Sequence, residues 1–306
     1  MTEEINRWKI GNVTITRVIE LEGGFPPGAM FTGLTEDRVK SIAWIHPHYA
    51  DPDGTVRYSV HAYVLESQGR SIIVDTCIGN DKARGHEGWN RLKLPFIERL
   101  TAAGYPPESI DVVLCTHLHL DHVGWNTRWD NQKWVPTFPN ARYLFGRSEW
   151  EHWTRDAHGT GDMPEFASAL AEQETVMNDS VLPIVRAGLQ ELVETDHRVN
   201  DEVSLFPTPG HTPGHVSVAI SSGGRKATIT GDLIHNPIQI ADPGICANFD
   251  FDQKLALSTR RTFISNHESK DVLVLGTHFP SPNAGHIVRD KGGWRFVSAE
   301  EGSDDQ

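Results

Sequence analysis

Four side chains with metal-binding chemistry fall within six positions of the segment THLHLDH, residues 116–122. His117 and His119 are two positions apart after an apolar run, so on an extended chain they share a face. A turn after them can bring Asp121 and His122 toward the same volume. Imidazole and carboxylate donors without a thiolate are typical of zinc, with iron, manganese or cobalt as alternatives. The segment therefore predicts a metal site.

Further donors follow three later runs of strand character, because one hexapeptide cannot close a catalytic metal site. These runs end in TPGHTPGH, ITGDLIH and LGTHFP, and they supply His211, His215, Asp232, His235 and His278. Each donor stands where a strand is expected to give way to a loop. Loops held by a rigid sheet are the usual place for an active site.

The elements that must position these residues are strands mixed with helices. Alternating or continuous apolar runs predict strands at residues 12–21, 58–67, 70–76, 110–117, 203–206, 215–220, 226–234, 271–278, 285–289 and 293–297. Helical patterns occupy residues 35–45, 89–103 and 252–267. The polar, helical stretch at about 147–188 interrupts this rhythm. We expect one α+β domain over residues 1–306, with a helical insertion or lid at about 147–188.

Composition excludes several classes of protein. The 28 Lys and Arg against 41 Asp and Glu give a net charge of −13, which opposes a nucleic-acid partner. The N-terminus lacks a signal-peptide pattern, and no stretch has membrane-spanning length. Cys77, Cys115 and Cys246 are far apart without CxxC spacing, so we expect neither a disulfide framework nor a zinc knuckle. A cytoplasmic protein without a membrane partner is expected, and a homodimer is compatible with the sequence.

Taken in order, these motifs resemble those of the metallo-β-lactamase superfamily. The HxHxDH segment, TPGHTPGH, the pair Gly231 and Asp232, and the GTH that ends at His278 are spread over residues 60–297, and VDT at residues 74–76 also fits. The resemblance implies a four-layer αβ/βα sandwich, with metals at one edge between two β-sheets.

The resemblance also implies two divalent metal ions, with zinc expected first. One would be held by His117, His119 and His211, and the other by Asp121, His122 and His278. Asp232 would bridge the two ions. Asp75 would orient the ligands, and His215 would support its segment without binding metal.

A cage of this kind implies hydrolysis. Two cations that share one water lower its pKa toward neutrality, so that a bridging hydroxide is the nucleophile. Asp121 and Asp232 would then take part in catalysis through the metals. No GxSxG motif is present, and no cysteine has a motif that would activate it.

Within the superfamily the chain is similar to lactonases, aryl-ester hydrolases and methyl-parathion-type phosphotriesterases. A lactone or aryl ester is the expected substrate, and a phosphotriester is the alternative. His235 stands where signal lactonases carry tyrosine, three residues after the bridging aspartate, and a catalytic and a structural role are both open. Trp125, Phe25 and Phe31 are expected to line an apolar substrate pocket.

Two other classes are weaker interpretations. A mono-iron oxidoreductase of the same fold would need only one metal, and diiron oxygen reducers usually carry Glu at the position of His119. A nuclease would need a basic groove, which the net charge of −13 opposes.

Overall fold

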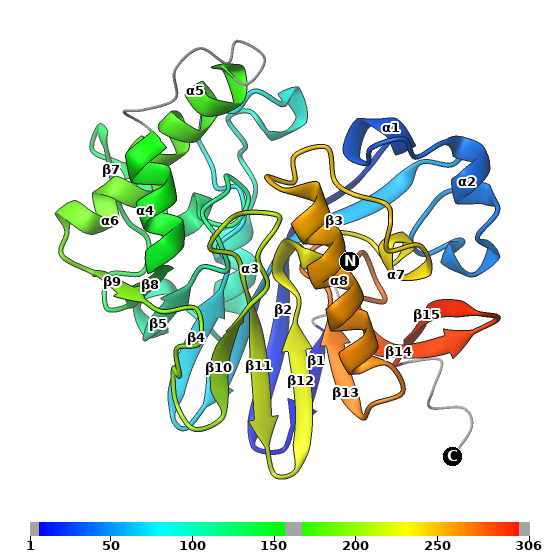
Figure 1. Ribbon diagram of the computed structural model, residues 1–306. Coiled ribbons are helices and arrows are strands. Elements are labelled where there is room, and N and C mark those ends of the chain that lie inside the picture. Colours follow the sequence, from blue (N-terminus) through cyan, green and yellow to red (C-terminus); the bar gives the residue numbers. More distant parts are fainter. Residues whose placement is uncertain (1–5, 157–166, 300–306) are drawn as a thin grey trace. The chain divides into compact units, whose positions relative to one another are not determined.

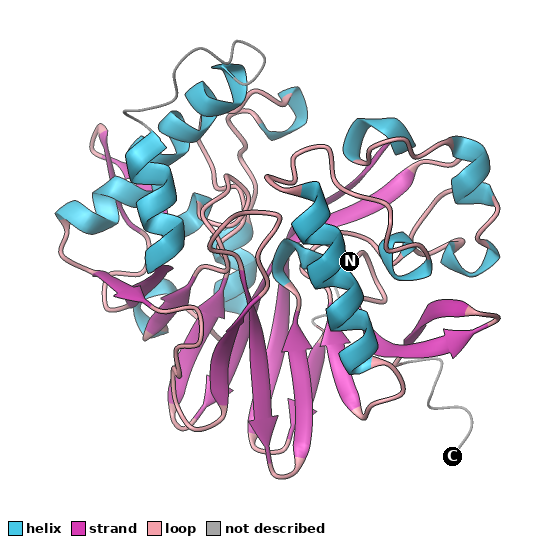
Figure 2. Ribbon diagram, in the orientation of Figure 1, coloured by secondary structure: helices cyan, strands magenta, loops and turns pink. Residues whose placement is uncertain are grey.

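The computed structural model describes residues 6–156 and 167–299. The chain divides into two compact units (Figure 1): the first unit comprises residues 1–20 and 60–195, and the second unit comprises residues 21–59 and 196–306. Each unit combines strands with helices (Figure 2), and this confirms the predicted α+β class. The prediction of a single domain over residues 1–306 stays a prediction.

The main sheet of the first unit has seven strands, in the order β1-β2-β3-β4-β5-β8-β9. They are β1 (Arg7–Ile10), β2 (Val13–Phe25), β3 (Val56–Ser67), β4 (Arg70–Val74), β5 (Val112–Leu114), β8 (Arg142–Gly146) and β9 (Gln190–Val193). Strands β2 and β3 continue into the residues of the second unit. From β4 to β9 neighbouring strands are parallel. The central strand β5 is entirely buried, as is usual for parallel strands covered on both faces.

Helices and short turns connect these strands. They are η2 (Glu87–Trp89), α3 (Phe96–Ala102), η3 (Pro107–Ser109) and η4 (Gly124–Asn126), and β6 (Thr127–Asp130) and β7 (Lys133–Pro136) form a separate hairpin. The helix predicted over residues 89–103 is shorter than expected, because α3 begins only after its N-cap, Pro95. Proline has a fixed φ and no N–H, so it fits at a helix start and not within a helix.

The segment at about 147–188 is helical in its described residues, as predicted. It contains α4 (Arg147–Asp156), α5 (Ala167–Val176), the π-helical turn η6 (Met177–Val181) and α6 (Leu182–Arg186). Residues 157–166 lie outside the described residues. A buried ion pair holds η6: Nη1 and Nη2 of Arg84 lie 2.8 and 3.1 Å from the carboxylate of Asp179. The role of this segment as a lid stays a prediction.

The sheet of the second unit has six strands, in sequence order from β10 to β15. They are β10 (Val203–Pro207), β11 (Val216–Ser222), β12 (Arg225–Ile229), β13 (Val272–Leu275), β14 (Ala284–Asp290) and β15 (Gly293–Ser298). Strands β12 and β13 pair in parallel, and the other neighbours pair antiparallel. All six match runs that the sequence predicts to be strands.

The helices of the second unit are α1 (Pro27–Met30), α2 (Glu36–Lys40), η1 (Ala43–Ile45), η7 (Gly231–Leu233), α7 (Ile238–Ala241) and α8 (Gln253–His267). Asp252 caps α8 by accepting hydrogen bonds from the N–H groups of Lys254 and Leu255, so the helix starts where the sequence predicts. In the predicted helix at residues 35–45, only α2 and η1 form. No helix among the described residues is both long and apolar enough to cross a bilayer.

Candidate metal centre

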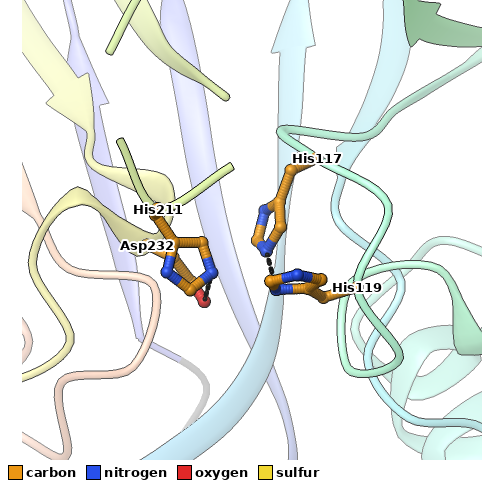
Figure 3. Close-up of side chains that lie close together, drawn as sticks. All are labelled: His117, His119, His211 and Asp232. Carbon is orange, nitrogen blue, oxygen red and sulfur yellow. Dashed lines mark hydrogen bonds and ion pairs between the residues drawn. The ribbon is translucent and has the colours of Figure 1, made fainter. Parts of the chain in front are cut away.

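The first unit carries one set of donors in the loop that follows β5. Nε2 of His117 lies 3.0 Å from Nδ1 of His119, as the dashed line in Figure 3 shows. The turn predicted after them is present, since the N–H of His122 donates to the carbonyl of His119. Nε2 of His122 then lies 3.6 Å from Oδ1 of Asp121. The structure thus brings all four donors of the HxHxDH segment together.

Asp75 fixes this loop from the end of β4. Its carboxylate accepts from Nδ1 of His122 at 2.9 Å and from the backbone N–H of Thr116 at 2.8 Å. Close packing adds to this, because a Cβ at Gly124 would lie 1.8 Å from the carbonyl oxygen of Ile78. Asp75 therefore has the contacts of the orienting residue that the sequence predicts.

The second unit carries another set of donors around the buried Asp232. Oδ2 of Asp232 lies 3.3 Å from Nε2 of His211 and 3.2 Å from Nε2 of His235. Oδ1 lies 3.1 Å from Nε2 of His278. Figure 3 draws the pair of Asp232 and His211. One carboxylate thus directs its two oxygens toward different imidazoles.

Four of the imidazoles share one pattern of hydrogen bonding, in which Nδ1 bonds to a fixed group while Nε2 faces a neighbouring imidazole or carboxylate. His119 differs, because its Nδ1 faces Nε2 of His117. The Nδ1 partners are the hydroxyl of Thr116 for His117, the carboxylate of Asp75 for His122, the carboxylate of Asp250 for His211 and the carbonyl of Ser59 for His278. A carboxylate or carbonyl oxygen can only accept a hydrogen bond. In His122, His211 and His278, Nδ1 therefore carries the proton and Nε2 presents its lone pair. Metal-binding histidines are usually held in this way.

His215 differs from these rings because both of its nitrogens are used inside the protein. The backbone N–H of Asp232 donates to Nε2 at 2.8 Å, and Nδ1 lies 3.0 Å from the carbonyl of Thr208. Nothing larger than glycine fits beside this ring, because a Cβ at Gly231 would lie 2.5 Å from its Nε2. These contacts are those of a supporting residue, and the role of His215 stays a prediction.

Asp250 and Arg260 are parts of this site that the sequence does not reveal. Asp250 accepts from Nδ1 of His211 at 2.9 Å, and its other oxygen lies 3.6 Å from Nη2 of Arg260. The guanidinium of Arg260 is buried and also donates to the carbonyls of Leu233 and Ile245. Although burial opposes it, hydrogen bonding to His211 holds the pKa of the Asp250 carboxyl below its usual value. No local pattern marks these residues, which lie far along the chain from the ligand they support.

His235 is buried beside Asp232, at the position where the sequence leaves its role open. Neither of its ring nitrogens makes a hydrogen bond among the described residues. Burial lowers its pKa, although the neighbouring Asp232 acts in the opposite direction. Its ring centroid lies 5.3 Å from that of Phe249, a side chain that is 47% exposed and that also meets His211 edge-on. No local pattern in the sequence marks Phe249.

The three predicted pocket residues have different surroundings. Phe31 is buried and lies edge-on to His235, with ring centroids 6.4 Å apart. Phe25 stacks on Tyr58. Trp125 stacks on Phe96, and its indole N–H donates to Glu20. The contacts of Trp125 are those of a core residue, and the pocket role of all three stays a prediction.

The donors of both sets suit a divalent transition metal. They comprise imidazole nitrogens and carboxylate oxygens and no thiolate, since the three cysteines lie apart from them as free thiols. The buried nitrogens of His235, which make no hydrogen bond among the described residues, are a further sign of polar chemistry at this place. The chain thus has His and Asp groups suitable for binding metal.

Comparison with known proteins agrees with this chemistry. The family model described as the metallo-beta-lactamase superfamily matches residues 55–278. An N-acyl homoserine lactonase of a Bacillus species is 28% identical over 219 residues, which cover 65% of this chain and 73% of the relative. The N-acyl homoserine lactonase AttM of Rhizobium radiobacter is 24% identical over 192 residues, or 60% of this chain and 64% of the relative.

Solved structures extend the likeness in fold to nearly the whole chain. The hydrolase AbOPH of the beta lactamase superfamily aligns with a TM-score of 0.80 and 24% identity, over 96% of both chains. AidC, described as a dizinc quorum-quenching lactonase, aligns with a TM-score of 0.77 and 20% identity, again over 96% of both chains. At this level of identity the likeness shows a common fold.

Proposed function

The chain belongs to the metallo-beta-lactamase superfamily and is a hydrolase with its α+β fold, and from this premise we propose that it hydrolyses a lactone or aryl carboxylic ester with two metal ions. The observation that carries the proposal is the way three of the ligand imidazoles are held. His122, His211 and His278 are fixed through Nδ1 by an oxygen that can only accept, and each turns Nε2 toward a carboxylate, which is a usual arrangement of metal-binding histidines.

We assign seven ligands to the two ions. Two groups of candidate donors support this assignment: one comprises His117, His119, His211 and Asp232, and the other comprises Asp121, His122 and His278. Asp232 is the proposed bridge, since its Oδ2 faces His211 and its Oδ1 faces His278. Zinc is the proposed metal because the donors are imidazoles and carboxylates, and manganese, cobalt or iron would suit the same donors.

The metals, when bound, would lower the pKa of a shared water and polarise the substrate carbonyl. The residues of the chain would do the remaining work. Asp75 and Asp250 hold the rings of His122 and His211 in one orientation and one tautomer. His235, which is buried beside Asp232, is proposed to hydrogen bond to the substrate or to the leaving oxygen.

A substrate with an apolar substituent fits the surroundings of the second unit's donors. Phe249 is about half exposed and lies against the rings of His211 and His235, and Phe251 is 63% exposed. The curated relatives are named for lactone hydrolysis. The net charge of −13 opposes polyanions. These observations support a neutral lactone or aryl ester.

The test is a substrate panel assayed on zinc-loaded protein. It includes acylated lactones, aryl esters, a phosphotriester, a β-lactam and a glutathione thioester, with Asp232→Ala as the inactive control. We expect the highest kcat/KM for a lactone or an aryl ester. Preference for the β-lactam, or equal turnover by Asp232→Ala, would contradict the proposal.

A further inference from the structure

Helices α4 and α5 of the insertion both hydrogen bond to the backbone of Leu118, in the loop that carries His117 and His119. This residue stands between His117 and His119 and is fully buried. Its N–H donates to Oε1 of Glu149 at 3.3 Å, and its carbonyl accepts from Nε2 of Gln173 at 2.8 Å. Glu149 belongs to α4 and Gln173 to α5, so two helices of the insertion hold the same residue.

These two hydrogen bonds act on the two peptide groups that join the ligands. The N–H of Leu118 belongs to the planar peptide that follows His117, and the carbonyl belongs to the peptide that precedes His119. Rotation of either peptide would change the direction of a neighbouring side chain. Holding both peptides therefore restricts the directions in which the side chains of His117 and His119 leave the backbone.

Glu149 also connects this backbone to the ring beside His119. The same Oε1 accepts from the indole N–H of Trp153 at 2.7 Å, and the Trp153 ring lies 5.7 Å from the ring of His119. The carboxylate is almost fully buried, at 1% exposure. A buried carboxylate is costly to desolvate, and an apolar side chain at this position would pack at lower cost.

We propose that Glu149 and Gln173 are positioning residues for the metal centre, and that helices α4 and α5 thereby support that centre. They act through Leu118 on His117 and His119, without touching metal or substrate. The inference rests on the proposed function, because it requires that these two histidines bind metal. Loss of either hydrogen bond should weaken metal binding more than it weakens the fold.

The test compares variants that remove one hydrogen bond at similar volume. Glu149→Leu removes the acceptor and Gln173→Met removes the donor, whereas Glu149→Gln keeps a carbonyl oxygen in place. Glu172→Leu is the matched control, since Glu172 of α5 accepts from the N–H of Gly85 at 2.7 Å and so joins the insertion to a different loop. Zinc affinity is measured by competition with a chromophoric chelator, and urea unfolding is measured on the metal-free proteins.

We expect Glu149→Leu and Gln173→Met to bind zinc about 10- to 100-fold more weakly than wild type, as is usual when a group that orients a ligand is lost. Glu149→Gln and Glu172→Leu should bind close to normally, and metal-free stability should fall no further in the two test variants than in the control. If Glu149→Leu fails to fold, the zinc affinity of Gln173→Met tests the proposal.

The two proposals fail in different ways. Wild-type protein that binds no metal would overturn the proposed function. Wild-type protein that binds two metals, together with variants that bind them as tightly as Glu172→Leu does, would overturn only the positioning role. A loss of metal-free stability with unchanged zinc affinity would likewise show that Glu149 and Gln173 serve helix packing alone.

Discussion

At the scale of single residues, hydrogen bonds divide the histidines of the site into three kinds. His122 and His211 are fixed through Nδ1 by carboxylates. His215 uses both nitrogens within the protein. His235 makes no hydrogen bond through its ring among the described residues. The same side chain can thus be a ligand, a support or a group available to a substrate, and its neighbours decide which.

The variant His235→Ala tests whether His235 is available to the substrate. We expect kcat/KM for esters to fall more than tenfold and on the order of 10²-fold, which is the low end of the effect of losing a general acid or hydrogen-bond donor. The metal content should stay at two per chain. Steady-state kinetics and metal analysis on the same sample measure both quantities. Full ester activity in the variant would show that His235 is structural.

At the scale of elements, the turn η7 depends on its first residue. Gly231 has φ of +56°, a region that glycine adopts without strain, and its missing Cβ leaves room for the ring of His215. The N–H of the next residue, Asp232, then donates to that ring. The position of the proposed bridging carboxylate therefore depends on a glycine and a histidine that are 16 residues apart in the sequence.

Gly231→Ala should lower both stability and metal binding. The control is Gly224→Ala, because Gly224 also has a positive φ, of +78°, but has open space where a Cβ would lie. We expect a loss of about 1 kcal/mol in the control from backbone strain alone, and a larger loss at Gly231. Urea unfolding measures the difference. Equal losses at the two positions would mean that the contact with His215 is unimportant.

The insertion is also held at η6. Nζ of Lys82 donates to the hydroxyl of Thr127 at 2.7 Å and lies 3.6 Å from the carboxylate of Asp179. Burial lowers the pKa of Lys82 to about 7, although Asp179 acts in the opposite direction. In the unfolded chain the ordinary pKa is about 10.4, so between these values the unfolded state holds the extra proton. The contribution of Lys82 to stability therefore rises with pH over that interval.

Lys82→Met removes this dependence. The difference in free energy of unfolding between wild type and variant should increase from about pH 7 toward pH 10, by at most about 1.4 kcal/mol per pH unit. Urea unfolding of both proteins over that interval measures it. A difference that is constant with pH would show that Lys82 keeps its proton in the folded protein.

At the scale of the whole molecule, the proposed metals take ligands from residues that are distant in sequence. A ligand that binds only the folded state stabilises it, by about 2.7 kcal/mol for one site at 100 times its Kd. A chelator should therefore lower the melting temperature and abolish hydrolysis, and zinc should restore both. Calorimetry with metal analysis checks this. An unchanged melting temperature in metal-free protein would contradict metal binding by the fold.

The candidate ligands could be named from the sequence because their signals are local. His117, His211, Asp232 and His278 each follow an apolar run, and those runs are the strands β5, β10, β12 and β13. The spacing of apolar residues and the turn residues that follow them mark such runs over a few positions. The pattern that predicts helices in the insertion is equally local.

Three further supporting residues, Glu149, Gln173 and Asp250, could not be predicted for the opposite reason. Glu149 lies 31 residues from Leu118, Gln173 lies 55 residues from it, and Asp250 lies 39 residues from His211. Each resembles an ordinary polar residue of a helix or loop, and only the folded chain gives it a partner. The helix predicted over residues 89–103 was wrong for a different reason. The helical spacing of apolar residues extends to both sides of Pro95, but the helix begins only after this proline.

The buried Nδ1–H groups of His122, His211 and His278 have a spectroscopic consequence. Each proton is shared with a carboxylate or carbonyl and is shielded from solvent, so it should exchange slowly with water. Such protons give resolved downfield signals in a proton NMR spectrum, outside the crowded amide region. Titration of metal-free protein with a diamagnetic ion would then report the filling of each position, signal by signal, before any substrate is known.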